Sequence, residues 1–443
     1  MSLGSMARAS AFACALMAIA GADRACADDS IKALAKAYNG FGQDLFTVLE
    51  HKPGNIVFSP YSVGVAMAMT MSGARGDTQS EMLSAMRFTQ TPSEIEGANG
   101  PLAAELHSYA RQLPAQPSPK EICAKMRRSD AECIKRVTAA WKPPAAPTRL
   151  EIANALMVRR LGDVIGNVST SYASLLREKF GAELFQNVSL EAINTWASRK
   201  TKGKIPALLD KLPGDAIAVI LDAVYFHGAW QAPFESKRTR NAPFTLGSGE
   251  IVQTATMEVD RGFALYEGQG FKALRLPYQT PELGMVIVVP SDPKRLSQVS
   301  ASLDAAGQAK LFQELDRAPS QLLDLKLPRF KLQYKASLKE PMKLAGLKLA
   351  FDNGQANFDG IAGKPLRPGT LFIDDVIHAA TIEVAEEGTE ASAATAVEIV
   401  LTAVAVEPKP FAVDRPFLFY IVDQASGAVL FQGRIEDPRP APG

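Results

Sequence analysis

The chain of 443 residues has an ordinary globular composition, with 47% hydrophobic, 21% charged and 7% aromatic residues, which excludes a disordered or collagen-like protein. Its 48 Lys and Arg residues nearly balance its 47 Asp and Glu residues, so no overall electric field would recruit nucleic acid or an acidic membrane surface. We therefore expect neither a nucleic acid nor a membrane as a partner.

The first 27 residues have the pattern of an export leader. Met6 and Arg8 precede an apolar run over 11–20, and Ala25-Cys26-Ala27 fits the small-x-small pattern of a cleavage site. The apolar run is too short to anchor the chain as a membrane span. The sequence therefore predicts a signal peptide over 1–27 and a secreted or periplasmic mature protein over 28–443, in an Ala-rich style typical of bacteria.

Only two cysteines, Cys123 and Cys133, lie beyond this leader. In an oxidising compartment we expect them to form a disulfide. Nine residues separate them, so the crosslink would stabilise the fold by only about 2–3 kcal/mol in the chain-entropy model. A metal or redox pair would require closer spacing or neighbouring histidines, and we expect no metal site.

The first part of the mature chain has mainly helical patterns. Apolar residues recur at helical spacing from 29 to 49, and Ser59 to Ser62 supply an N-cap before a segment, 63–71, that is apolar nearly all round and predicts a buried helix. Prolines then bracket an inserted excursion over 113–148. Between 120 and 142 it carries seven Lys or Arg against three acidic residues, which indicates a solvated face or a polyanion-binding patch.

Strand patterns dominate the second half. The continuous apolar run 216–226 predicts a central strand buried on both faces. Helices are expected over 169–180 and 193–209, the second ending near Gly203. Further strands are expected over 150–159, 253–259, 271–276, 284–289, 322–330, 372–383 and 417–422. This order predicts one α+β domain built around large sheets.

A search for catalytic chemistry finds no motif. Only four histidines are present, none in an HExxH pattern, and the sequence lacks GxSxG, GxxxxGK[ST] and a GxGxxG that follows a strand. Acidic pairs such as Asp374-Asp375 are too common to assign acid and base roles, and neighbouring strand residues face opposite ways. We therefore expect neither an enzyme nor a cofactor.

An unusual segment of small residues follows the predicted strand 372–383. From Thr389 to Ile399 alternate positions are apolar or β-branched, whereas Glu390, Ser392 and Glu398 share the other face, as in a half-buried strand. The Ala-rich composition fits a helix or a mobile loop equally well. Taken alone, the segment could also be an ordinary edge strand with its connector.

Several motifs in order along the chain closely resemble the serpin family. They are NIVFSPYS (55–62), SGARGDT (72–78), KTKGKI (200–205), DAVYFHGAW (222–230), LPRF (327–330), IH (377–378), EEGTEA (386–391) and DRPFLF (414–419). The resemblance covers roughly Ser30 to Pro438 and is interrupted mainly by the insertion. It implies a single serpin-like domain of three β-sheets and about nine helices, with a hinge and exposed reactive loop over 386–411.

The resemblance implies an irreversible suicide-type inhibitor of serine endopeptidases that traps a covalent acyl-enzyme, acting as a monomer. The implied reactive bond is Thr402–Ala403, flanked by Val400, Leu401 and Val404, which favours an elastase-, subtilisin- or chymotrypsin-like target over a trypsin-like one. The alternative is a non-inhibitory serpin-like carrier or chaperone. The implied hinge residues, which would enter the main sheet, are Glu386, Glu387, Gly388, Thr389, Glu390, Ala391, Ser392, Ala393 and Ala394.

The family pattern also implies a polar cluster beneath the point where the sheet opens. Its members here would be Ser59, Ser62, Asn194 and His378, with Trp230 as the aromatic residue at the top of the opening. For His378 alone, a hydrogen-bonded core histidine is an equally good interpretation. The insertion departs from the common pattern, and a polyanion remains a second partner to test there.

Overall fold

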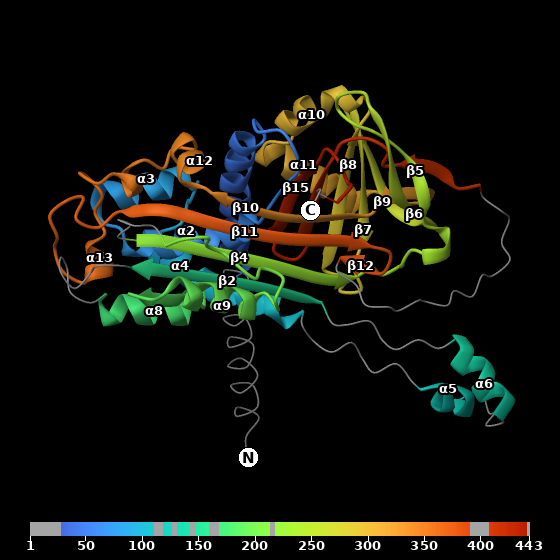
Figure 1. Cartoon of the computed structure of the whole chain (residues 1–443), viewed down its shortest axis with the longest axis horizontal. Helices are drawn as coiled ribbons and strands as arrows, with labels where there is room; N and C mark the ends of the chain where they lie inside the picture. The colour runs from blue at the N-terminus through green and yellow to red at the C-terminus, as the bar shows by residue number, and fades with distance from the viewer. Residues whose placement is uncertain are drawn as a thin grey trace, which may run out of the picture.

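The computed structural model describes residues 28–109, 118–125, 131–140, 148–158, 168–212, 218–389 and 407–440 (Figure 1). The predicted signal peptide and the loop residues 390–406 lie outside these ranges. Helices cover the faces and one end of two β-sheets that share a continuous hydrophobic core.

The most buried helix is α2 (Pro60–Gly73), in which every residue is buried. Ser59 caps its first turn by accepting a hydrogen bond from the Ser62 amide at 3.0 Å, and Pro60 occupies the first helical position, where its missing N–H costs nothing. The helix over 28–49 packs across it so closely that a Cβ atom on Gly64 would come within 2.4 Å of the Tyr38 ring. Both helices predicted for this region are confirmed.

The other α-helices of the main body are short to medium in length. Among the described residues, every helix is too short or too polar to cross a lipid bilayer. They are α3 (Gly76–Ala85), α4 (Pro92–Ser108), α8 (Thr170–Phe180), α9 (Leu190–Lys200), α10 (Leu296–Ser302), α11 (Ala305–Arg317), α12 (Lys339–Leu344) and α13 (Asp359–Ala362), with 3-10 turns at η1 (Ser236–Arg238), η2 (Pro293–Arg295) and η3 (Leu349–Phe351). Helix α9 ends before Gly203, whose φ of 80° marks the following turn.

The first sheet has six strands in the order β10-β11-β12-β4-β2-β3. Its strands are β2 (Arg149–Val158), β3 (Glu183–Gln186), β4 (Ala218–Ala229), β10 (Phe330–Ser337), β11 (Ile373–Ala385) and the two-residue β12 (Gly388–Thr389). Strand β4 is buried along its whole length, as its unbroken apolar run predicts. It runs parallel to β11 and antiparallel to β2.

The second sheet has nine strands, with the path β1-β15-β14-β8-β7-β6-β9-β13 and β5 paired to β6. Its strands are β1 (Ile56–Phe58), β5 (Arg240–Thr245), β6 (Ile251–Gly268), β7 (Phe271–Pro277), β8 (Leu283–Pro290), β9 (Ser320–Pro328), β13 (Lys409–Ala412), β14 (Phe417–Asp423) and β15 (Val429–Ile435).

The α+β class is confirmed, with two differences in the count of elements. The described residues form two hydrogen-bonded sheets instead of three, because the 18-residue strand β6 continues from one packed region into the next and joins them. The described residues contain twelve α-helices against the nine or so expected, and two of the twelve belong to the insertion.

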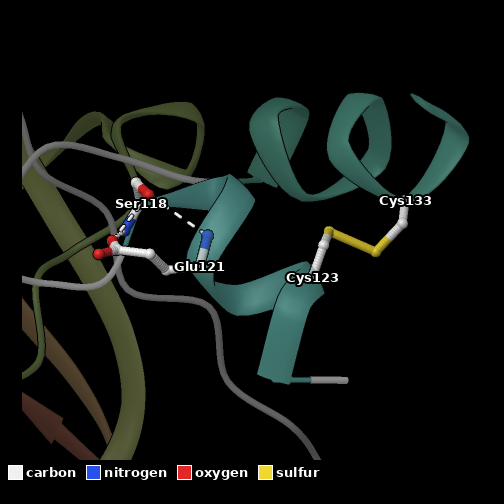
Figure 2. The surroundings of a disulfide bond; sticks show 4 residues. All are labelled: Ser118, Glu121, Cys123 and Cys133. Carbon is white, nitrogen blue, oxygen red and sulfur yellow. Dashed lines mark hydrogen bonds between the residues drawn. A yellow bond between two sulfur atoms is a disulfide. The ribbon is translucent and has the colours of Figure 1, made fainter. Parts of the chain in front are cut away.

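The insertion contributes α5 (Pro119–Lys125) and α6 (Ala131–Ala140), joined by a disulfide between Cys123 and Cys133 whose Cα atoms are 6.1 Å apart (Figure 2). That separation lies within the range that an S–S bond can bridge. Figure 1 shows the two helices set apart from the main body.

Candidate functional site

The end of β11 turns back and places the first residues of the predicted hinge inside the six-stranded sheet. Gly388 pairs with Ala229 of β4 and Ala385 of β11, while Thr389 pairs with Gly228 and Val384. Strand β12 is antiparallel to both neighbours, which below this point pair directly with each other from Ile373 to Thr381. The sheet is therefore open by two residues at one end and closed along the rest of the β4–β11 contact.

Gly388 fits this position because it has no side chain. An ideal Cβ atom there would lie 2.2 Å from the carbonyl oxygen of Gly228 and 2.7 Å from the Cα of Ala229. Those atoms belong to the backbone of β4, which cannot move away without breaking the sheet. Close approach of two backbones, more than the conformational freedom of glycine, is what requires Gly388 here.

An aromatic pair forms a platform beneath the hinge. Trp230 is 1% exposed, stacks on Tyr278 with ring centroids 4.6 Å apart, and donates from its indole N–H to the Ala385 carbonyl at 3.0 Å. The Trp230 amide donates to the Glu387 carbonyl at 2.9 Å. The Tyr278 and Thr389 hydroxyls are 2.7 Å apart, and burial raises the pKa of Tyr278, so this phenol stays neutral. Trp230, which was predicted at the top of the opening, directly follows Ala229, the β4 residue that pairs with Gly388.

Glu386 anchors the turn between β11 and β12. Its carboxylate accepts hydrogen bonds from Arg329, whose Nε lies at 2.8 Å, and from the Thr239 hydroxyl at 2.5 Å, and its carbonyl accepts from the Phe234 amide at 2.7 Å. Burial alone would raise the pKa of Glu386, but the bonds from Arg329 and Thr239 outweigh burial and hold the pKa below its usual value. The anchor is therefore charged at neutral pH.

A second polar cluster crosses the closed part of the sheet. Asp222 of β4 faces His378 of β11 in register, with the carboxylate oxygen 3.1 Å from the imidazole Nδ1, and the Ser62 hydroxyl donates to the same carboxylate at 2.6 Å. The Ser59 amide points at Nε2 of His378 from 3.4 Å. These bonds fit a neutral imidazole that donates from Nδ1 and accepts at Nε2. We call Ser59, Ser62, Asp222 and His378 the strand clasp; all four are 0% exposed.

Three of the four residues predicted for this cluster are brought together, and Asn194 is not. Asn194 lies on α9, where its side-chain oxygen accepts from the amides of Leu208 and Leu209 at 2.9 Å each, and its amide group donates to the Leu209 carbonyl. It therefore fixes the segment that follows α9. Asp222 takes its place in the clasp, and the signal for it in the sequence was the single carboxylate inside the apolar run 216–226, since a buried charge needs partners.

The strand clasp contains Ser, His and Asp but lacks the arrangement of a hydrolase. The Ser62 hydroxyl donates to Asp222 and not to a histidine base, so the carboxylate lies between the other two groups and cannot orient the imidazole toward a nucleophile. Among the described residues, no group of three or more His, Cys, Asp or Glu side chains could hold a metal ion. The clasp is built to hold two strands together.

The implied reactive bond Thr402–Ala403, its flanks Val400, Leu401 and Val404, and the hinge residues Glu390, Ala391, Ser392, Ala393 and Ala394 lie outside the described residues. Both ends of the loop are described. It leaves the six-stranded sheet at Thr389, and the chain joins the edge of the nine-stranded sheet at β13, which runs parallel to β9. The loop therefore connects the two sheets.

Replacing Gly388 by Ala should displace β12 from the sheet, because the added methyl group would overlap the backbone of β4; we expect about 1–3 kcal/mol of local destabilisation. In a background with Trp141→Phe and Trp196→Phe, where Trp230 is the remaining tryptophan, its emission should shift to longer wavelength. Gly97→Ala is the control, since a Cβ at Gly97 meets nothing within 4 Å. Equal emission spectra for the two variants would contradict the packing described for Gly388.

Replacing Glu386 by Lys should also release the turn, because two cations would then face each other at Arg329. Since the folded-state pKa of Glu386 is depressed, its stabilising effect is complete above the unfolded value of about 4.3 and is lost as the pH falls through the folded value. In the same Trp141→Phe, Trp196→Phe background and with Glu386 present, Trp230 emission should therefore change only in acid below about pH 4. Glu383→Lys, which breaks a more exposed pair with Lys331, should leave the emission unchanged, and an equal shift in both variants would rule out a specific anchor.

Replacing Asp222 by Asn should weaken the strand clasp, because neutral hydrogen bonds would replace charge-assisted ones. We expect amide hydrogen exchange in β4 and β11 to become about tenfold faster, equivalent to about 1.4 kcal/mol. Asp423→Asn is the matched control. Asp423 is also 0% exposed, but it lies on β14 of the nine-stranded sheet, where it accepts a hydrogen bond from the Tyr109 hydroxyl. Slower exchange in Asp222→Asn would contradict this prediction. The free energy cost of burying the Asp222 charge would then exceed the stabilisation from its hydrogen bonds.

Comparison with known proteins identifies the family of this chain. The family model described as serpin (serine protease inhibitor) matches residues 36–438. The chain is 32% identical over 421 residues to the leukocyte elastase inhibitor of Bos taurus, covering 91% of this chain and 99% of that protein. It is 31% identical to Iripin-2 of Ixodes ricinus, covering 91% and 93%. Among solved structures, Serpin48 of the insect Tenebrio molitor superposes with a TM-score of 0.72 at 26% identity, covering 92% of this chain and 98% of its own. The chain belongs to the serpin family.

Proposed function

We propose that this serpin is an irreversible inhibitor of serine endopeptidases that works by loop insertion. The protease serine attacks the carbonyl carbon of Thr402 and forms an acyl ester, while the peptide bond breaks and Ala403 leaves as a free amine. The severed segment that begins at Thr389 then lengthens β12 between β4 and β11. The acyl-enzyme is carried with it before water hydrolyses the ester.

The observation that carries this proposal is the position of β12. Its two residues already occupy the space between β4 and β11 with the antiparallel pairing that a longer inserted strand would need. Thr389 is 0% exposed, so its face of the strand points into the protein. Ala391, Ala393 and Thr395 follow on the same face and are small enough to be buried without a large steric or desolvation penalty.

The residues around the proposed reactive bond favour a target that accepts small or medium aliphatic side chains. Leu401, Thr402, Ala403 and Val404 include no Lys or Arg, so a protease with an acidic specificity pocket is disfavoured. Elastase-like and subtilisin-like enzymes fit Thr402, and a chymotrypsin-like enzyme fits Leu401. We place this activity in a secreted or periplasmic mature protein, where Cys123 and Cys133 would remain oxidised.

The mature protein should be mixed separately with elastase, subtilisin, chymotrypsin and trypsin and examined by SDS gel electrophoresis. We expect a stable high-mass band with at least one of the first three proteases, and the mass of the released C-terminal peptide should identify Ala403 as its first residue. If every protease cleaves the loop and stays active, the chain is a carrier or chaperone with a serpin fold.

Replacing Thr389 by Arg should convert the inhibitor into a substrate, because a charged side chain at this buried position would displace β12, from which the inserted strand has to lengthen. We expect the stoichiometry of inhibition to rise at least fivefold. Ser392→Arg places the same charge on the opposite face of the strand, with Glu390 and Glu398, and should leave the stoichiometry near the wild-type value. The same stoichiometry for both arginine variants would count against insertion of this segment.

A further inference from the structure

The residues that flank the insertion contact the main body near the hinge. Before the insertion, the Tyr109 hydroxyl donates to Asp423 at 2.8 Å; after it, the Thr148 and Thr280 hydroxyls are 2.6 Å apart. Asp423 pairs with Leu283 in the sheet, so both contacts are made to the turn between β7 and β8 and its immediate neighbours. The two ends of the insertion therefore meet at one place on the body.

This turn also supports the point where the reactive loop leaves the sheet. Tyr278, two residues before Thr280, has its hydroxyl 2.7 Å from that of Thr389, and the Gln279 amide donates to the Ala229 carbonyl at 2.8 Å. Two residues of chain span at most about 7 Å. The insertion and the reactive loop thus start from neighbouring positions at the same end of the molecule, and Figure 1 places α5, α6 and β12 on the same side.

Chain length limits how far the two helices can lie from this point. Nine residues after Tyr109 the chain reaches Ser118 at the start of α5, and a segment of that length spans at most about 30 Å. A compact protease of about 230 residues has a radius of gyration of about 17 Å, which corresponds to a diameter of about 45 Å. A protease bound to the reactive loop is therefore large enough to meet α5 and α6.

A helix cap and a disulfide stabilise the two helices of the insertion. Ser118 and Glu121 form a reciprocal cap at the start of α5, in which the Ser118 amide and hydroxyl donate to the Glu121 carboxylate at 2.7 Å each and the Glu121 amide donates to the Ser118 hydroxyl at 3.3 Å (Figure 2). Helices this short are unstable alone in water, and the disulfide holds α5 and α6 together. The result is a small rigid surface.

The stretch of sequence that contains these two helices also has an excess of positive charge. Seven basic residues face three acidic ones between 120 and 142, whereas the rest of the chain has 41 basic and 44 acidic residues. Of the described residues, Lys120, Lys135 and Arg136 are exposed cations on the two helices. A surface of this charge attracts an acidic one and raises the rate of association with it.

We propose that α5 and α6, through Lys120, Lys135 and Arg136, bind an acidic surface patch on the same protease that attacks the reactive loop. This inference rests on the proposed inhibitory function and adds a second contact outside the loop. The contact acts on recognition: it guides the protease to the loop and so raises the association rate constant, while the events after cleavage depend on the hinge.

The test compares the whole mature chain with a triple variant, Lys120→Glu, Lys135→Glu and Arg136→Glu, against the protease that forms the SDS-stable band. At 50 mM NaCl the second-order rate constant of inhibition should fall at least tenfold, and at 500 mM NaCl by less than threefold because salt screens the contact. The stoichiometry of inhibition should not change. Lys348→Glu, Lys364→Glu and Arg367→Glu together form the control, since these residues are exposed near α12 and α13, at the opposite end in Figure 1, and alter the net charge equally.

Equal rates for the wild type and the Lys120 triple variant would overturn the second contact and leave the inhibitory function intact. Failure of all proteases to form the covalent band would instead refute the inhibitory function. In that event, the second contact can still be tested with a protease whose active serine has been blocked. This protease should bind the wild type and not the Lys120 triple variant. If heparin, and not the protease, binds these residues and accelerates inhibition, the surface is a polyanion site and the proposal is wrong.

Discussion

The parallel contact between β4 and β11 is the constraint on which the rest of the structure depends. Parallel pairs have slanted hydrogen bonds and are slightly less stable per residue than antiparallel ones. A strand that enters between these two replaces one parallel ladder by two antiparallel ladders, as β12 already does over Gly388 and Thr389. In the proposed mechanism the sheet would gain hydrogen bonds as β12 lengthens, and the described residues contain the first two positions of that strand.

Two polar groupings oppose this gain at different points along the contact. The strand clasp joins Asp222 to His378 across the closed part, and Glu386 ties the turn to Arg329 at the open end. A buried carboxylate that loses its partner costs several kcal/mol, so each grouping would add to the barrier for insertion. The apolar platform of Trp230 and Tyr278 lies between them and supports β12 in its present position.

The sequence was informative wherever a pattern extends over many residues. The buried run of β4, the helix α2 and the strands of the second half follow from hydrophobic periodicity, and the family motifs predicted a hinge at 386–394. Asn194 was misassigned because motif matching gives the order of residues along the chain, whereas the clasp depends on which side chains share one face of adjacent strands. Asp222 and the roles of Arg329 and Thr239 depend on contacts between residues 57 to 156 positions apart, and no local pattern contains that information.

One turn of the chain links recognition to the opening of the sheet. Tyr278 contacts Thr389, Gln279 bonds Ala229, and Thr280 bonds Thr148 at the base of the insertion. A protease held by α5 and α6 would therefore apply any force through Thr148 to the same three residues that support β12. Thr148 is also followed directly by β2, whose first residue Arg149 pairs with His227 of β4, so the base of the insertion is joined to the six-stranded sheet by the chain as well as by the hydroxyl pair with Thr280. In the proposed mechanism, contact through α5 and α6 would raise the rate of encounter, whereas trapping of the acyl-enzyme would depend on the lengthening of β12 between β4 and β11.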